Sequence, residues 1–314
     1  MRLGVLDVGS NTVHLLVVEA RPGSHPEPVR RHKSELRLSE VIGASGRLGD
    51  RGRELLVEAV AAAADAAREE RVDDLVSFAT SAVREATDSA EVIAYVRART
   101  GVDLVVLPGE DEAAMTFLAV RRWFGWSAGR LLSLDIGGGS LEIASGRDES
   151  PQLALSLPLG AARLTRGWLG GDPPSAREIQ GLREHVWQEL VVVAARVAEC
   201  GRPDLAVATS KTFRSLARLD GAAPSALGPR VRRSLSRAGL EVIVERLSSM
   251  SVAQRCQLPG VSPSRAGQLL AGAIVALEAL SAFSVERVDI CPWALREGVV
   301  LRRLDWLHEG DPLA

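Results

Sequence analysis

Two stretches of the chain combine an aspartate with a turn of small residues, a pattern that can bind phosphate. In LDIGGGSLEI, residues 134–143, Asp135 ends an apolar strand and Glu142 lies in the strand that follows. The turn between the two strands consists of Gly137, Gly138, Gly139 and Ser140. Because consecutive glycines weaken a regular element, they indicate a bare-backbone turn whose N–H groups point at an anion. An aspartate beside such a turn can hold Mg²⁺, which prefers carboxylate, water and phosphate oxygens.

The stretch LDVGSNTVHLLVV, residues 6–18, repeats this plan. Asp7 ends an apolar strand, and a second apolar strand follows a turn that contains Gly9, Ser10 and Asn11. The two aspartates are 135 − 7 = 128 residues apart. A supersecondary unit repeated at that distance predicts two related domains. Neither turn is a P-loop or a dinucleotide fingerprint, because no Lys-Ser or Lys-Thr follows the glycines and a strand follows the turn.

The bulk properties are those of a globular protein of two domains. The chain has 314 residues, of which 46% are apolar and 25% charged, with a formal net charge of −2. This charge gives no reason to expect a nucleic-acid-binding surface. The three cysteines fit neither a disulfide framework nor a metal knuckle. Asp7 comes too early for a signal peptide, and no apolar run reaches the roughly 18 residues of a membrane span. We therefore expect a cytoplasmic protein without a membrane partner.

Strand-like and helix-like segments alternate along the chain, which predicts an α/β fold with mixed sheets. We expect one domain over residues 1–126 and another over 127–314, the last helix, about 297–308, being a candidate to pack back on the first domain. Two apolar segments, residues 189–199 and 269–280, are expected to be buried helices. The predicted strands of the first half are 3–6, 13–18, 74–80 and 103–109, and its helices are 54–70, 89–100 and 110–124.

The paired hairpins resemble the phosphate-1 and phosphate-2 loops of the actin, Hsp70 and sugar-kinase superfamily. Six motifs in order resemble, more narrowly, the exopolyphosphatase and guanosine-pentaphosphate phosphohydrolase (Ppx/GppA) family, in its short two-domain form. They cover nearly the whole chain: DVGSNTVHLLV, ATSAVRE, GEDEA, DIGGGSLE, LPLGAARLT and PSRAGQLLAGA. The resemblance implies two actin-like (ribonuclease H-like) domains, each a mixed sheet flanked by helices, with the active-site cleft between them.

The resemblance also implies catalytic roles for two glutamates. In GEDEA, residues 109–113, three acids open a predicted helix, which the helix dipole alone would favour. The family pattern identifies the last of them, Glu112, as the general base that activates water. Glu142 matches a further family acid, which we expect to position metal or water. Such a site suits phosphoryl transfer, which depends mainly on positioning and electrostatics.

The remaining candidates are cations and the two loops. Arg84 in ATSAVRE, Arg163 in LPLGAARLT and Arg265 in PSRAGQ match family motifs and are expected to bind phosphate. Lys211, which with Lys33 is one of two lysines in the chain, replaces a common family glycine. A long cation there should narrow a nucleotide-base pocket and offer a charge to phosphate. The expected metal ligands are Asp7, Asp135 and Glu142, and the expected substrate-binding residues are Gly9, Ser10, Asn11, Arg84, Gly137, Gly138, Gly139, Ser140, Arg163, Lys211 and Arg265.

The sequence therefore predicts a Mg²⁺-dependent exopolyphosphatase, with Mn²⁺ as a substitute metal, that acts on inorganic polyphosphate and forms a homodimer. Hydrolysis of guanosine pentaphosphate at the same site is the nearest alternative, with guanosine tetraphosphate as a related ligand. A superfamily kinase is a second alternative, but the loop ATSKTF lacks the glycine of an adenosine pocket. The third is a non-catalytic sensor of polyphosphate or a nucleotide.

Overall fold

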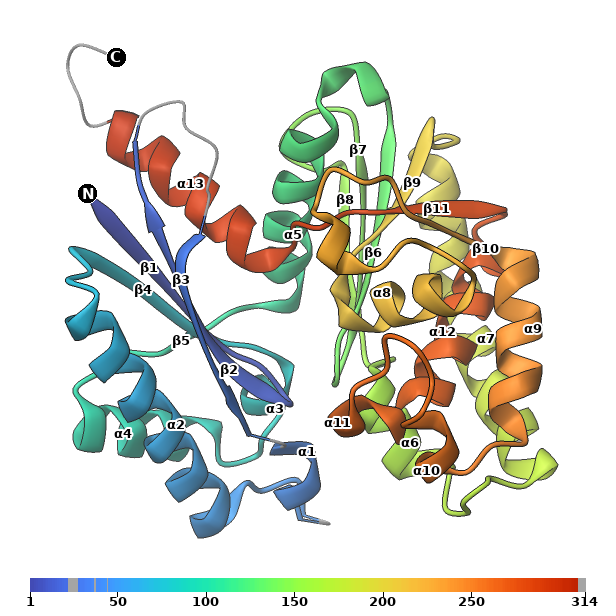
Figure 1. Cartoon of the computed structure of the whole chain (residues 1–314), viewed down its shortest axis with the longest axis horizontal. Coiled ribbons are helices and arrows are strands. Elements are labelled where there is room, and N and C mark those ends of the chain that lie inside the picture. Colours follow the sequence, from blue (N-terminus) through green and yellow to red (C-terminus); the bar gives the residue numbers. More distant parts are fainter. Residues whose placement is uncertain (22–27, 37, 44, 310–314) are drawn as a thin grey trace. The chain divides into compact units, whose positions relative to one another are not determined.

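The computed structural model describes residues 1–21, 28–36, 38–43 and 45–309 (Figure 1). Two compact units make up the chain. Unit 1 contains Met1–Met115 and Leu295–Ala314, and unit 2 contains Thr116–Ala294. The sequence placed the division at residues 126/127 instead. The boundary of the structure falls inside helix α5, Gly109–Phe124, because the first turns of this helix pack with unit 1 and the later turns with unit 2.

Unit 1 is a five-stranded mixed sheet of order β3-β2-β1-β4-β5 (Figure 1). Strands β1, β2 and β3 are antiparallel neighbours, whereas β1, β4 and β5 run parallel. The strands are β1 Arg2–Val8, β2 Thr12–Glu19, β3 Pro28–Glu35, β4 Asp74–Ala79 and β5 Val105–Val106. The helices are α1 Leu38–Val41, α2 Gly49–Glu69, α3 Ser81–Arg84, α4 Ser89–Thr100, the first turns of α5, and α13 Leu295–Glu309.

The period-2 alternation of β1 separates two apolar clusters and decides where Asp7 points. Leu6 and Val8 belong to the cluster that packs with α2 and α4. Leu3 and Val5 belong to the cluster that packs with α13. Asp7 has the parity of Leu3 and Val5, so its side chain lies on the α13 face of the sheet.

Helix α13 approaches the backbone of α5 very closely. A Cβ atom at Gly298 would overlap the carbonyl oxygen of Met115, so a glycine is required at this contact. The approach positions the first turn of α13 beside β1. The sequence identified this helix as a candidate to pack on the first domain, and in the structure its residues belong to unit 1.

Unit 2 repeats the arrangement with a six-stranded sheet of order β10-β11-β9-β6-β7-β8. Its central hairpin, β6–β7, is antiparallel, and β6 and β9 are parallel, as β1–β2 and β1–β4 are in unit 1. The strands are β6 Leu131–Ile136, β7 Leu141–Gly146, β8 Leu153–Leu157, β9 Leu205–Ala208, β10 Ser234–Ser236 and β11 Arg287–Ile290. The helices are the later turns of α5, α6 Ala161–Trp168, α7 Ala176–Glu199, α8 Ser210–Leu219, α9 Arg237–Ser248, α10 Val252–Arg255, α11 Pro263–Ala266 and α12 Leu269–Ala282.

One of the two predicted buried helices is confirmed and the other is wrong. In α12, every residue from Leu269 to Leu280 is buried, as expected for a helix that is apolar all round. In α7, a single stripe is buried, and Val191 and Val192 are 47% and 76% exposed. The reason is that α7 packs by one face only, so its apolar run at 189–199 turns partly to solvent.

The sequence also missed strand β3 and helix α9. The β3 segment, PVRRHKSE, has no apolar alternation because it is an exposed edge strand. Its place in the sheet depends on pairing with β2, which no local pattern records.

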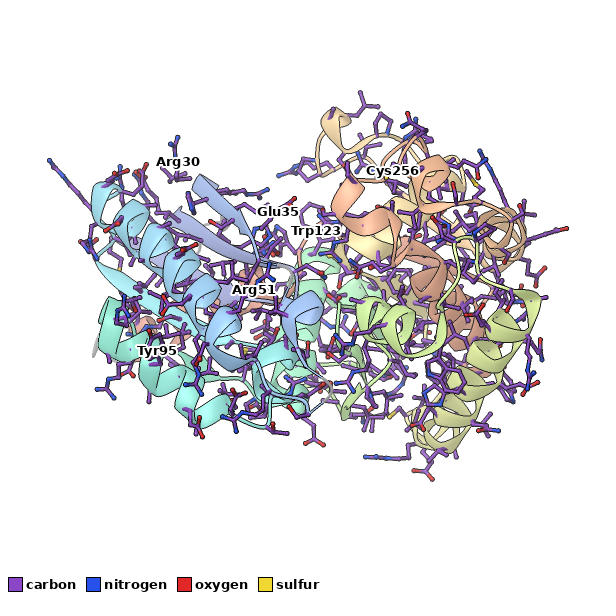
Figure 2. All side chains as sticks on the ribbon, turned by 90° about the horizontal axis from the view of Figure 1, so that it is seen from below. Arg30, Glu35, Arg51, Tyr95, Trp123 and Cys256 are labelled. Carbon is purple, nitrogen blue, oxygen red and sulfur yellow. The ribbon has the colours of Figure 1, made fainter. Side chains whose placement is uncertain are left out.

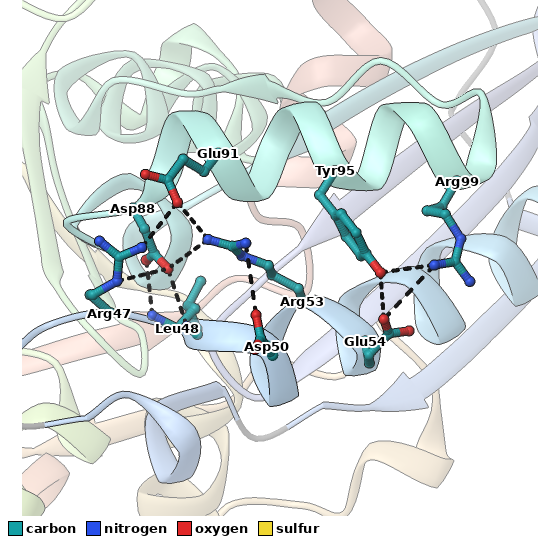
Figure 3. Close-up of polar contacts among 10 residues, drawn as sticks. Arg47, Leu48, Asp50, Arg53, Glu54, Asp88, Glu91, Tyr95 and Arg99 are labelled. Atoms are coloured by element: carbon teal, nitrogen blue, oxygen red, sulfur yellow. Dashed lines mark hydrogen bonds and ion pairs between the residues drawn. The ribbon is translucent and has the colours of Figure 1, made fainter.

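A buried carboxylate caps α2 from a distant loop (Figure 3). Asp88 is 2% exposed and accepts hydrogen bonds from the backbone N–H groups of Leu48, at 2.9 Å, and Gly49, at 3.1 Å. The guanidinium groups of Arg47 and Arg53 lie 3.8 and 3.6 Å from the same carboxylate. Burial by itself would raise the pKa of Asp88. The two backbone donors and Arg47 outweigh burial, so the pKa lies below its ordinary value.

Replacing Asp88 by asparagine should therefore destabilise the protein at neutral pH by about 1–3 kcal/mol, the scale of losing hydrogen bonds to a charged group. A carboxylate with a lowered folded-state pKa stabilises the fold above its unfolded pKa, and the effect is lost as pH falls through the folded value. The difference between wild type and Asp88→Asn should thus shrink below about pH 4. Denaturant unfolding at several pH values measures it.

The matched control is Asp50→Asn, which removes an exposed carboxylate 3.9 Å from Arg53 in the same network (Figure 3). An exposed pair of this kind contributes little. Equal destabilisation by the two variants at all pH values would contradict a capping role for Asp88.

Candidate functional site

The glycine loop of unit 2 turns its carbonyl oxygens toward the start of helix α6. The carbonyl of Gly137 accepts a hydrogen bond from the N–H of Ala161, and the carbonyl of Gly138 accepts from the N–H groups of Ala162 and Arg163. The carbonyl of Gly139 accepts from the N–H of Gly160 and from Nε–H of the Arg163 side chain. All five bonds are 3.0–3.2 Å long. In a planar trans peptide, the C=O group and the next N–H group point in opposite directions. The N–H groups of Gly138, Gly139 and Ser140 therefore point away from α6. Within the described residues they have no hydrogen-bond acceptor, which leaves three donors for an anion.

The loop of unit 1 is built in the same way. The N–H of Gly9 donates to the carbonyl of Thr12 at 3.0 Å, as the N–H of Gly137 does to Ser140 at 2.9 Å. The carbonyl oxygens of Ser10 and Asn11 accept from Leu38 and Leu36, at 2.8 and 2.9 Å. The two hairpins predicted from the repeat are thus confirmed as copies of one turn.

Two carboxylates lie side by side next to the unit 2 loop. Asp135 on β6 and Glu142 on β7 are directly opposite each other in the ladder, so their side chains share one face of the sheet. Glu142 is 4% exposed and accepts a hydrogen bond from the Ser156 hydroxyl of β8 at 2.9 Å. Asp135 accepts a hydrogen bond from the hydroxyl of Thr209, which follows β9. Ser156 and Thr209 thus hold a pair of acidic oxygens beside the anion-binding turn.

Unit 1 offers a different set of groups at the same place. The residue opposite Asp7 is His14, and 14 + 128 = 142, so the histidine stands where unit 2 has Glu142. The carboxylate of Asp7 accepts a hydrogen bond from Arg296 Nη1 at 3.3 Å, from the first turn of α13. Burial raises the pKa of Asp7, the Arg296 guanidinium opposes this, and Glu297 adds to it. Unit 2 therefore has the better donor set for a divalent cation.

Replacing Arg296 by methionine should show how much the burial of the Asp7 carboxylate destabilises the fold. The guanidinium opposes the effect of burial, and its loss should raise the pKa of Asp7 further. A carboxyl with a raised folded-state pKa destabilises the fold as pH rises above its unfolded value of about 4. We expect Arg296→Met to be less stable than wild type by about 1–3 kcal/mol near pH 7, and by less near pH 5.

Thermal unfolding at the two pH values measures this difference. Arg302→Met, a change of the same kind in the same helix at a position that does not contact Asp7 in the structure, is the control. If Arg296→Met lost the same stability at both pH values, Arg296 would stabilise the fold through packing and not through the charge of Asp7.

The predicted general base and the predicted phosphate-binding arginine are in contact. Arg84 Nη1 donates to a carboxylate oxygen of Glu112 at 2.9 Å and to the carbonyl of Leu107, also at 2.9 Å. Their side chains are only 19% and 14% exposed. The other two acids in the first turn of α5, Glu110 and Asp111, are exposed. The helix dipole suits all three acids, but only Glu112 is held in place by an arginine.

The other predicted cations of unit 2 lie around the glycine loop. Arg163 contacts Gly139 through its side chain. Burial lowers the pKa of Arg265, and the nearby carboxylate of Asp135 opposes this shift. Lys211 is exposed in the first turn of α8. Arg214, which was not predicted from the sequence, donates through Nε to the Ser210 carbonyl at 3.0 Å. Its positive charge also contributes to lowering the pKa of Arg265.

Four polar residues of these sites were not predicted: Ser156, Thr209, Arg214 and Arg296. A signal for Thr209 was present, because the tripeptide Ala-Thr-Ser begins at the last residue of a strand in both halves, at residues 79–81 and 208–210. In unit 1 the serine of this tripeptide, Ser81, lies 3.1 Å from the hydroxyl of Ser10 in the loop. The repeat therefore extends beyond the hairpins to the next parallel strand.

The fold and its paired phosphate-type loops define an actin-like, two-domain class of protein, and comparisons with known proteins agree. The family model described as the Ppx/GppA phosphatase family matches residues 16–307. Proteins named exopolyphosphatase 1 from Mycobacterium tuberculosis and Mycobacterium leprae are each 56% identical over 313 residues, covering 100% of this chain and 91–92% of theirs.

Solved structures show the same fold. The Ppx/GppA family member of Aquifex aeolicus has a TM-score of 0.81 at 24% identity, with 99% of each chain covered. An exopolyphosphatase from Cytophaga hutchinsonii has a TM-score of 0.87 at 22% identity, with 98% of each chain covered. This chain belongs to the Ppx/GppA phosphatase family. Among its described residues, no helix has the length and apolarity needed to cross a bilayer.

Proposed function

We propose that this protein is an exopolyphosphatase, which releases terminal orthophosphate from inorganic polyphosphate. One observation carries the proposal: three backbone N–H groups of the unit 2 loop point away from α6, beside the carboxylates of Asp135 and Glu142. Such donors suit a phosphoryl group, whose charge must be stabilised during transfer. The family, and the 56% identity to the mycobacterial proteins named exopolyphosphatase 1, support the same reaction.

In the proposed reaction, water attacks the terminal phosphorus and the bond from phosphorus to the bridging oxygen breaks. Glu112 accepts a proton from the attacking water, while the shortened polyphosphate leaves with the bridging oxygen. Arg84 orients Glu112 and adds a positive charge for the transferred phosphate. The N–H groups of Gly138, Gly139 and Ser140 bind phosphate oxygens. In unit 1 the N–H groups of Ser10 and Asn11 do the same, whereas Gly9 shapes the turn through its N–H bond to Thr12. Arg163, Lys211 and Arg265 hold further phosphates.

The residues of unit 2 fit a magnesium ion that arrives with the substrate. No group of three or more His, Cys, Asp or Glu side chains that could hold a metal occurs among the described residues. Mg²⁺ needs no such group, because it usually keeps several waters and takes one or two carboxylates plus phosphate oxygens. Asp135 and Glu142 would hold it in unit 2, where Mn²⁺ could replace it, and Asp7 is the corresponding carboxylate of unit 1. A bound ion would neutralise charge on the transferred and leaving phosphates.

Replacing Asp135 by asparagine should raise the Mg²⁺ concentration needed for half-maximal activity about tenfold or more, because a neutral amide replaces a carboxylate at a hard-cation site. Titration calorimetry with Mg²⁺ and tripolyphosphate should show the same loss of affinity. The variant Asp148→Asn, which changes an exposed loop aspartate of the same unit, is the control. If the Mg²⁺ titration of Asp135→Asn matched that of the wild type, Asp135 would not be a metal ligand, and the ion would be held by Glu142, Asp7 or the substrate alone.

The cytoplasm and a homodimer remain part of the proposal. Cys200, Cys256 and Cys291 form no disulfide within the described residues, which suits a reducing compartment. Inorganic polyphosphate ranks above guanosine pentaphosphate and tetraphosphate, because the exposed Lys211 adds charge for a phosphate chain at the position where the family commonly has glycine.

The deciding experiment measures phosphate release from tripolyphosphate, long-chain polyphosphate, guanosine pentaphosphate and ATP, each with Mg²⁺ and with EDTA. We expect Mg²⁺-dependent release that is fastest from polyphosphate. Faster release from guanosine pentaphosphate would reverse the order of the two substrates. Release from none of the four, together with polyphosphate binding, would identify a sensor and overturn the proposal.

A further inference from the structure

Strand β3, at the edge of the unit 1 sheet, carries cations on the same face as Asp7. In the ladder, Asp7 lies opposite His14, and His14 lies opposite Lys33. Directly opposite residues of antiparallel strands share a face, so these three side chains form a row across β1, β2 and β3. Arg31 is two residues from Lys33 on β3 and therefore lies on the same face.

The packing of the neighbouring strand confirms this assignment of faces. Leu16, opposite Arg31, belongs to the cluster that packs with α13. Leu15, opposite His32, belongs to the cluster that packs with α2. Arg30 also lies on the α2 side, where its Nε is 3.5 Å from Glu70, just after the end of α2. Arg31 and Lys33 thus lie on the face that carries Asp7.

These two cations differ from Arg30 in their charge environment. Arg31 and Lys33 are exposed, and neither has a carboxylate partner in the described part of the chain, whereas Arg30 is paired with Glu70. Glu35 is the acid that β3 carries on this face. Adjacent strands are about 4.8 Å apart, so the backbone of Lys33 lies roughly 10 Å from that of Asp7. One phosphate group held beside Asp7 does not reach Lys33, but a chain of several phosphates does.

We propose that Arg31 and Lys33 form an outer binding site for the polyphosphate chain, extending from the Asp7 loop across β2 to the sheet edge. The inference rests on the proposed function and adds the residues that favour long chains over short ones. A polyphosphate chain is charged at every phosphate and needs no shaped pocket, so exposed cations in a row suit it. Arg296, beside Asp7, provides a further cation at the inner end of the row.

The test compares Arg31→Gln/Lys33→Gln with the control Arg30→Gln/Arg51→Gln. Both double variants remove two positive charges from unit 1. The control changes the opposite face of the same strand and an exposed position on α2 (Figure 2). The measurements are KM for tripolyphosphate and for long-chain polyphosphate, at low and high salt, with static light scattering as a check on association.

At low salt, we expect Arg31→Gln/Lys33→Gln to raise KM for long chains about tenfold or more, with little change for tripolyphosphate. High salt should reduce the difference from wild type, because exposed charges are screened. Equal changes for both chain lengths, or the same change in the control variant, would overturn the proposal. It would also be overturned if the variant only increased self-association, since charged residues also protect sheet edges from pairing.

Failure of this inference is distinguishable from failure of the proposed function. If the wild type releases no phosphate from either polyphosphate, the function is wrong. If the wild type hydrolyses both and the Arg31→Gln/Lys33→Gln variant keeps the wild-type KM for long chains, only the outer site is wrong.

Discussion

Replacing Glu112 by glutamine is expected to lower the turnover of polyphosphate about 100-fold or more, the usual scale for removing a general base. Glutamine has nearly the same shape, and its side-chain oxygen can still accept the hydrogen bond that Arg84 donates at 2.9 Å. The fold and the arginine should therefore stay in place, and KM should change little. The amide has no basic oxygen for the proton of the attacking water, so the loss should appear in kcat.

The first turn of α5 supplies matched controls. Glu110→Gln and Asp111→Asn each remove one negative charge within two residues of Glu112, at exposed positions. If the three acids served only the helix dipole, all three variants would behave alike and lose a few tenths of a kcal/mol to about 1 kcal/mol of stability. If Glu112→Gln kept a near-normal kcat, Glu112 would not be the general base, and Glu142 would be the next candidate for that role.

Replacing Gly160 by alanine should disrupt the phosphate loop although residue 160 lies outside it. A Cβ atom at this position would overlap the backbone of Gly139 and Ser140. The backbone angles of Gly160, φ −74° and ψ 145°, are ordinary for alanine, so the clash is the whole effect. The loop must move to relieve this clash. The movement displaces the N–H group of Ser140, which is one of the three proposed phosphate donors. We expect kcat to fall about 100-fold, as it does when oxyanion donors are lost.

Gly167→Ala is the matched control for Gly160→Ala. Gly167 lies in α6, and a Cβ atom there would meet nothing within 4 Å. Alanine is the better helix former, so this variant should be as active as wild type and slightly more stable. Kinetics and inhibition by orthophosphate, measured on both variants, decide the matter. Wild-type kcat and orthophosphate inhibition in Gly160→Ala would show that the loop does not bind the transferred phosphate.

The predicted residues differ in how far the structure brings them together. Glu112 and Arg84 came from separate motifs and form one ion pair. Asp135 and Glu142 came from one motif and are directly opposite each other in the ladder. Arg163, predicted to hold phosphate, also braces the loop through Gly139. Asp7 and Asp135 looked equivalent in sequence, but only Asp135 has an acidic neighbour across the hairpin.

The sequence by itself determined the duplicated hairpins, because alternation, glycine content and the 128-residue spacing are local patterns that any copy of the turn must keep. It also determined the α/β class, the buried helix α12 and the family. Only the tertiary structure decided that Arg296 contacts Asp7 across 289 residues of chain, and that Thr209 contacts Asp135 across 74. The polar edge strand β3 was likewise decided by pairing with β2. The physical reason is that a local pattern specifies an element and its apolar face, whereas the partner of a polar side chain depends on which distant element packs beside it.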